Sequence, residues 1–138
     1  MKYIVDLSVL TLEDIPKVGG KSASLGEMLG SLTSLGINIP GGFALTVEAY
    51  RDFVDHNNLE EEIRRLMDEC DIDDLVQLRK TGTRIREIIR EGEFPRQVVD
   101  EIKKAYYDLS QVYGQKKTDV AVRSSATAED LPNASFAG

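Results

Sequence analysis

The chain has 138 residues, of which 41% are hydrophobic and 30% are charged, and its formal net charge is −7. This composition is typical of one globular domain, and the acidic balance argues against broad binding to nucleic acid or anionic membranes. The single cysteine, Cys70, excludes an internal disulfide, and no apolar run approaches the length of a membrane span. The N-terminus lacks a signal-peptide pattern, so we expect a cytoplasmic protein.

The first fifty residues predict two short strands around one helix. The stretch "YIVDL" (3–7) favours a strand, and "TLEDIPKVGG" (11–20) is typical of a loop. A helix is expected from Ser22, a candidate N-cap, toward Ser34, with Gly36 as its stop. The turn at Pro40-Gly41-Gly42 then leads into a second strand, "FALT".

A glycine pair followed by Lys-Ser, in "VGGKSASLGEM" (18–28), resembles the end of a P-loop. A P-loop requires a further glycine where this chain has Ile15, so that motif is excluded. Two glycines nevertheless allow a close backbone approach, and Lys21 at the start of a helix favours an anion. The alternative is a helix-capping turn beside an ordinary surface lysine.

The middle of the chain predicts four amphipathic helices. Thr46 caps the first (47–57), the second covers 59–70, "DIDD" (71–74) places acids in the first turn of the third, and the last runs from Pro95 to Gly114. Gly82 interrupts the third helix, and "EGEFP" (91–95) separates it from the last. Their apolar stripes are expected in the core: Ala49, Tyr50, Phe53, Leu59, Ile63, Leu66, Met67, Cys70, Leu75, Leu78, Ile85, Ile88, Ile89, Val98, Ile102, Ala105, Leu109 and Val112.

The C-terminal stretch differs from these helices. "DVAVRSS" (119–125) favours a strand that ends near Arg123, and a long hydroxyl-rich loop follows. An arginine at this place suits phosphate or carboxylate recognition, or else a salt bridge with Glu129 or Asp130. Because the chain stops at Gly138 within this unsupported loop, we expect it to be a fragment of a longer protein.

Taken together, "VGGKSASLGEM", "IPGGFALT", "DIDD" and "VAVRSSATAEDLPNASFAG" resemble the start of the phosphoenolpyruvate synthases (pyruvate, water dikinases). The likeness covers the chain from Val18 onward. The last motif is specific to a wider group of phosphohistidine dikinases, which includes pyruvate phosphate dikinase and rifampicin phosphotransferase. "DIDD" and "IREII" favour the synthase within that group.

The resemblance implies that residues 1–138 form the first lobe of an ATP-grasp-like nucleotide-binding domain. By matching position, Lys21 and Arg123 would contact ATP phosphates, with Ala137 and Gly138 as weaker candidates. The full enzyme would convert ATP, pyruvate and water to phosphoenolpyruvate, AMP and phosphate through a phosphohistidine. The second lobe, the Mg²⁺ ligands, the carrier-histidine domain and the pyruvate-binding domain would lie outside this chain, which would be inactive alone.

His56, the only histidine, matches no carrier motif and is expected on the surface. The overall expectation is an α+β fold: a mainly helical lobe with a few short strands, in which Lys21 and Arg123 converge. Two alternatives stay open: the ATP-binding part of a rifampicin phosphotransferase-like enzyme, and a helical module that binds a partner without chemistry.

Overall fold

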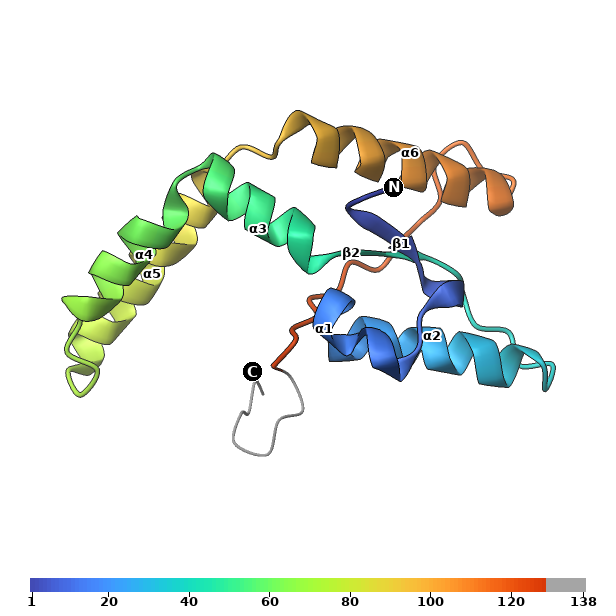
Figure 1. Cartoon of the computed structure of the whole chain (residues 1–138), viewed down its shortest axis with the longest axis horizontal. Coiled ribbons are helices and arrows are strands. Elements are labelled where there is room, and N and C mark those ends of the chain that lie inside the picture. The colour runs from blue at the N-terminus through green and yellow to red at the C-terminus, as the bar shows by residue number, and fades with distance from the viewer. Residues whose placement is uncertain (129–138) are drawn as a thin grey trace. The chain divides into compact units, whose positions relative to one another are not determined.

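The computed structural model describes residues 1–128, which contain six α-helices, two short strands and two 3-10 turns (Figure 1). These residues fall into two compact units. One comprises Met1–Ala49 with the chain from Gln97 onward, and the other is Tyr50–Arg96. The predicted mainly helical fold with a few short strands is confirmed at this level.

Two predicted strands form the only sheet among the described residues. Strand β1 (Ile4–Asp6) pairs antiparallel with β2 (Phe43–Leu45), so that Val5 faces Ala44. The neighbouring backbone at Tyr3 extends the contact, because its carbonyl accepts from the Thr46 N–H at 2.9 Å. The first strand is thereby held against the residue that starts the next helix.

The stretch predicted as a loop, residues 11–20, is mostly helical. A 3-10 turn, η2 (Leu12–Asp14), leads directly into the short helix α1 (Ile15–Val18). Thr11 and Asp14 form a reciprocal capping box, in which the Asp14 carboxylate accepts from the Thr11 N–H at 2.9 Å. The loop prediction was wrong because proline fits the first turn of a helix, and Pro16 lies in the first turn of α1.

Helix α2 (Gly20–Thr33) packs on the 3-10 turn η1 (Leu7–Val9), and Gly26 allows this close contact. Its C-terminal end is closed by Gly36, which has a φ of 78°, as predicted. The core around the helix contains four buried residues: Leu10, Val18, Ala23 and Ala44.

Helix α6 (Arg96–Val112) holds the N-terminus of the chain. The Glu101 carboxylate accepts from the Tyr3 N–H at 2.8 Å and from the Lys2 N–H at 3.1 Å. Desolvation raises the pKa of this carboxyl, but the backbone hydrogen bonds from Tyr3 and Lys2, together with the charge of the N-terminus, lower the pKa overall. Tyr3 also packs with Ala49 and Val98.

The second unit contains most of α3 (Val47–His56) together with α4 (Leu59–Asp68) and α5 (Leu75–Glu91), and α4 and α5 pack side by side (Figure 1). Its core is formed by Phe53, Leu59 and Ile88. Asn57 ties the two ends of the unit together, since its side chain donates to the Glu93 carbonyl at 2.9 Å and accepts from the Glu93 N–H at 2.8 Å.

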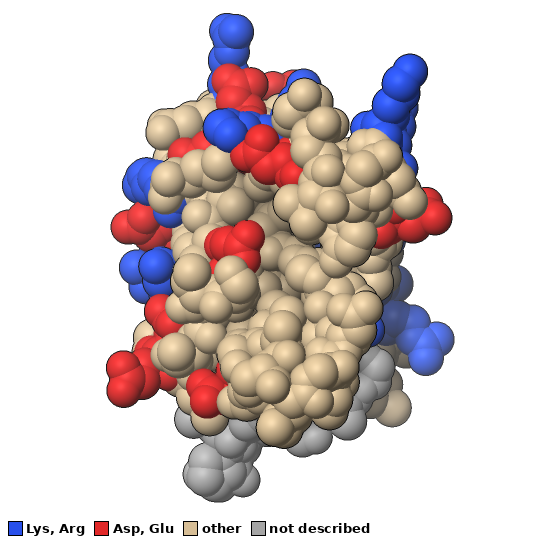
Figure 2. Space-filling model, turned by 90° about the vertical axis from the view of Figure 1, so that its right-hand side faces the viewer, with Lys and Arg blue, Asp and Glu red and all other residues tan. Residues whose placement is uncertain are grey.

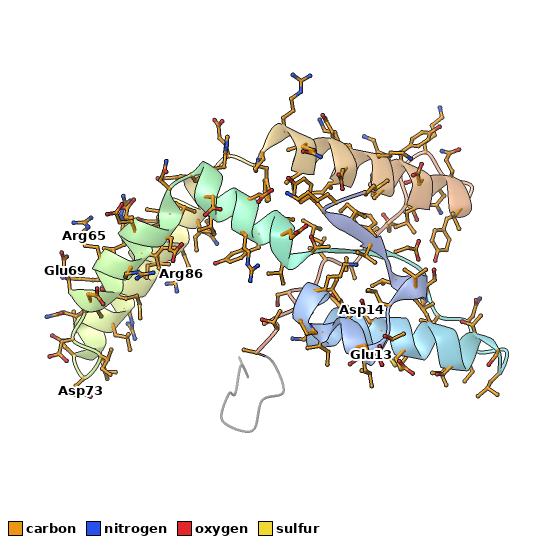
Figure 3. All side chains as sticks on the ribbon, in the orientation of Figure 1. Glu13, Asp14, Arg65, Glu69, Asp73 and Arg86 are labelled. Carbon is orange, nitrogen blue, oxygen red and sulfur yellow. The ribbon has the colours of Figure 1, made fainter. Side chains whose placement is uncertain are left out.

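The two predictions for the starts of α3 and α5 have different outcomes. Thr46 accepts from the Ala49 N–H at 3.4 Å, as predicted for α3. The acids of "DIDD" do not lie in the first turn of α5; instead Asp74 is its N-cap and accepts from the Val76 N–H at 2.8 Å. At the end of α4, Arg65 forms an exposed ion pair of 4.0 Å with Glu69, the C-cap residue (Figure 3).

Several apolar stripe residues predicted in the core are exposed. Leu75 is 76% exposed and Val112 is 80% exposed, and each lies at a helix end. The other exposed members of the predicted stripes are Tyr50, Met67, Leu78 and Ile89. Helical spacing identifies one face of a helix correctly, but it does not determine how far along that face a neighbouring element extends.

Candidate functional site

Lys21 is the second residue of α2, and its side chain is exposed. The helix starts two residues earlier than predicted, at Gly20, so Ser22 lies inside the first turn and is not the cap. The residue before the helix is Gly19, which has a φ of 82° and a ψ of 163°. Backbone in this region is essentially restricted to glycine.

A segment from the other end of the sequence caps this helix. The Ser125 hydroxyl accepts from the Ser22 N–H at 3.2 Å, and the Ala126 carbonyl accepts from the Gly20 N–H at 3.1 Å. These bonds satisfy two of the N–H groups that the start of a helix leaves without an internal partner. The two motifs singled out in the sequence are therefore in direct contact, across a separation of 103 residues.

The same contact explains the first glycine of the pair, Gly19. A Cβ added at Gly19 would overlap the Ser125 hydroxyl oxygen and would lie 2.8 Å from the amide nitrogen of Ala126. The predicted close backbone approach is thus confirmed, and the group approached is the protein's own chain. Sequence reasoning missed Ser125 as the cap, because nothing in the local pattern of residues 124–126 indicates which helix they contact.

Arg123 is exposed and lies two residues before this contact. The predicted strand over 119–125 is wrong, because the structure has irregular backbone there and Val122 is 93% exposed. A strand requires a neighbour, and in the described part of the chain β1 and β2 pair only with each other. Thr118, the residue before this stretch, is bound to α6 instead: its carbonyl accepts from the Tyr106 hydroxyl at 2.7 Å.

The other predicted site residues have different outcomes. Ala137 and Gly138 lie outside the described residues, as do Glu129 and Asp130, the suggested ion-pair partners of Arg123. His56 is exposed at the end of α3, as predicted. Within residues 1–128, no three His, Cys, Asp or Glu side chains gather in a way that could hold a metal ion.

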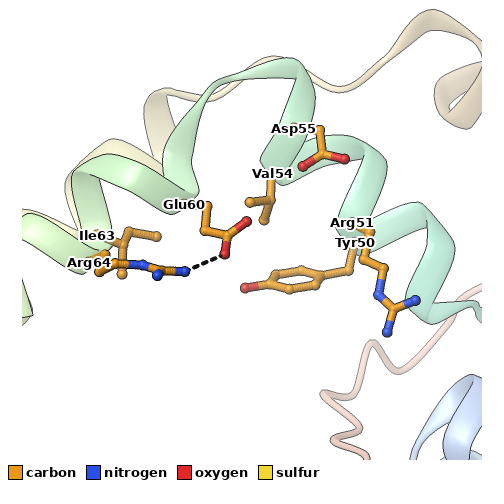
Figure 4. A pocket seen from close by; sticks show the side chains of 7 residues that line it. All are labelled: Tyr50, Arg51, Val54, Asp55, Glu60, Ile63 and Arg64. Carbon is orange, nitrogen blue, oxygen red and sulfur yellow. Dashed lines mark hydrogen bonds and ion pairs between the residues drawn. The ribbon is translucent and has the colours of Figure 1, made fainter.

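A shallow pocket of about 550 Å³ lies on the second unit, between α3 and α4 (Figure 4). Its size falls within the usual range for ligand pockets. Its charged lining is already paired in part, since Arg64 and Glu60 form a 2.8 Å ion pair there. None of its lining residues belongs to the two motifs in contact at α2, so we do not assign the site to it.

Charged side chains of both signs are dispersed over the face of the molecule shown in Figure 2. On the face shown in Figure 2, Lys and Arg side chains lie at separate points, with Asp and Glu side chains among them. No helix among residues 1–128 is both long enough and apolar enough to cross a membrane. Within α2 itself, Lys21 is the one basic side chain.

Comparison with known proteins shows the family to which the chain belongs. Residues 15–138 match the family described as "Pyruvate phosphate dikinase, AMP/ATP-binding domain". The chain is 52% identical over 132 residues to a phosphoenolpyruvate synthase of Aquifex aeolicus, covering 96% of this chain and 15% of that protein. It is 49% identical over 138 residues to the Pseudomonas aeruginosa phosphoenolpyruvate synthase, covering 100% of this chain and 17% of that protein.

A third relative, the phosphoenolpyruvate synthase of Escherichia coli, is 45% identical over 129 residues, which are 94% of this chain and 16% of that protein. The chain thus spans about a sixth of the length of these relatives. The matched region contains both Lys21 and Arg123. We conclude that the chain belongs to the family of the pyruvate phosphate dikinase AMP/ATP-binding domain and corresponds to the ATP-binding portion of the phosphoenolpyruvate synthases.

Proposed function

We propose that this chain serves as the first lobe of the ATP-binding domain of a phosphoenolpyruvate synthase. In that enzyme, ATP, pyruvate and water are converted to phosphoenolpyruvate, AMP and phosphate. The observation that carries the assignment of the site is the pair of hydrogen bonds joining the start of α2 to Ser125 and Ala126. They bring the lysine motif and the arginine motif to one place in the fold.

Lys21 and Arg123 are proposed to bind the phosphate groups of ATP. A lysine supplies a compact positive charge, and an arginine supplies a planar fork that matches two phosphate oxygens. Phosphoryl transfer requires positioning and charge neutralisation rather than covalent work by the protein. Both side chains are exposed, so each is accessible to a nucleotide.

The described residues do not offer a set of carboxylates suited to Mg²⁺, so the proposal assigns no metal ligand to them. The Mg²⁺ ligands, the carrier histidine and the pyruvate site are proposed to belong to further parts of a longer enzyme. Residues 1–138 alone are accordingly expected to be inactive. Pyruvate-dependent formation of AMP by the purified 138-residue chain would contradict this expectation.

The test of the site uses Lys21→Ala and Arg123→Ala in the longest natural protein that contains residues 1–138. Each substitution removes a charge-assisted hydrogen bond of about 1.5–3 kcal/mol. We therefore expect the ATP-dependent kcat/KM to fall at least about tenfold in each variant. Lys17→Ala is the matched control, because Lys17 is an exposed lysine on the neighbouring helix α1 and is expected to leave kcat/KM unchanged. Unchanged kinetics in both test variants would remove Lys21 and Arg123 from the site.

A further inference from the structure

The contact between α2 and residues 125–126 caps the helix, and it also lies next to Lys21 and Arg123 in the sequence. Ser22, whose N–H the Ser125 hydroxyl accepts, is the neighbour of Lys21. Arg123 is two residues before Ser125, and two extended residues span at most about 7 Å. The hydrogen bond between Ser22 and Ser125 therefore limits how far apart the backbones of Lys21 and Arg123 can lie.

Gly19 is required for this contact to form. With a side chain at position 19, the Cβ would occupy the place of the Ser125 hydroxyl and would lie 2.9 Å from the Ser125 carbonyl carbon. Because part of that obstruction is backbone, rotation of a side chain cannot relieve it. The φ of 82° at Gly19 adds a second reason why an L-residue does not fit there.

We propose that Ser125 is a positioning residue, which fixes Arg123 relative to Lys21 through its hydrogen bond to the Ser22 N–H, and that Gly19 makes this bond possible. The proposal rests on the proposed function, since it assigns a role in ATP binding to residues that need not contact the nucleotide. Ser125 acts through Lys21 and Arg123, so its contribution to binding depends on their presence.

The experiment is a double-mutant cycle on ATP affinity, measured by isothermal titration calorimetry with the longest natural protein that contains this chain. Ser125→Ala is expected to weaken ATP binding about threefold to tenfold, the range equivalent to one hydrogen bond. In the Lys21→Ala background, the same substitution is expected to weaken binding less than about twofold, because residues that act together are not additive. A residue that only stabilises the fold would give equal losses in both backgrounds.

Ser124→Ala and Gly30→Ala are the matched controls. Ser124 is the exposed neighbour of Ser125, and a Cβ at Gly30 meets nothing within 4 Å. Both are expected to retain the parent affinity, whereas Gly19→Ala is expected to lose at least as much affinity as Ser125→Ala. If Gly19→Ala does not fold, Ser125→Ala and its cycle still decide the question.

The outcomes separate the two proposals. If Lys21→Ala and Arg123→Ala weaken ATP binding but Ser125→Ala behaves as Ser124→Ala does, only the positioning role is refuted. The positioning role is also refuted if Ser125→Ala weakens binding equally with and without Lys21. If neither Lys21→Ala nor Arg123→Ala changes the affinity, or if the parent protein does not bind ATP, the proposed function fails and the positioning role fails with it.

Discussion

Two glycines of α2 provide a direct test of how this helix packs. Gly26 and Gly30 lie one helical turn apart, yet their surroundings differ completely. A Cβ added at Gly26 would lie 2.5 Å from both the Cβ and the carbonyl oxygen of Leu10, and 2.8 Å from the carbonyl oxygen of Leu7. A Cβ at Gly30 would meet nothing within 4 Å. Replacing each glycine with alanine is therefore predicted to change stability in opposite directions.

The expected magnitudes follow from two opposing effects. Alanine stabilises a helix interior by about 1 kcal/mol relative to glycine, so Gly30→Ala is expected to raise the free energy of unfolding by about that amount. Gly26→Ala gains the same helix stabilisation, but its added Cβ overfills a packed contact, and overfilling costs about 1–3 kcal/mol. Because two of the three obstructing atoms are backbone oxygens, we expect the upper part of that range. The net loss is then about 2 kcal/mol.

Urea unfolding followed by far-ultraviolet circular dichroism measures both changes. At an unchanged m-value, the shift in midpoint converts directly into a change in the free energy of unfolding. The two midpoints should lie on opposite sides of the parent midpoint. A Gly26→Ala variant that is as stable as Gly30→Ala would refute the close packing of α2 against Leu7 and Leu10.

Three further substitutions test other contacts of the structure. Glu101 has a lowered pKa when folded, so its carboxylate stabilises the fold above its unfolded pKa of about 4.3, and this stability is lost as the pH falls through the folded value. The difference in unfolding free energy between the parent and Glu101→Gln should therefore be largest near neutral pH and vanish in acid; a difference independent of pH would argue against it. Ser110→Ala removes the buried acceptor of the Thr118 N–H and should cost about 1–3 kcal/mol in thermal unfolding, whereas the exposed Ser124→Ala should be neutral. Asp74→Ala removes the N-cap of α5 and should lower the free energy of unfolding by about 1 kcal/mol, with a matching loss of helical circular dichroism on heating; an unchanged urea midpoint would exclude the cap.

The sequence alone determined five of the six described helices, α2 to α6, and several of their ends. Apolar spacing predicted α3, α4, α5 and α6, and the glycine at position 36 predicted where the α2 segment terminates. These features are local, because each helical hydrogen bond joins residues four apart, and the caps at Thr46, Asp74 and Gly36 lie within one turn of the helix that each one closes. The motifs around Lys21 and Arg123 were equally readable, and the family that they indicated is confirmed.

Tertiary structure decided what local spacing could not. The pattern in "DVAVRSS" is that of a strand, but the described chain provides no strand beside it, so residues 119–125 are irregular. The cap of α2 was predicted at Ser22 and is supplied instead by Ser125, from 103 residues away. Leu75 and Val112 continue apolar stripes at helix ends that no other element covers within residues 1–128. In each case the outcome depends on a partner that is distant in sequence, and only folding brings that partner into contact or leaves it out.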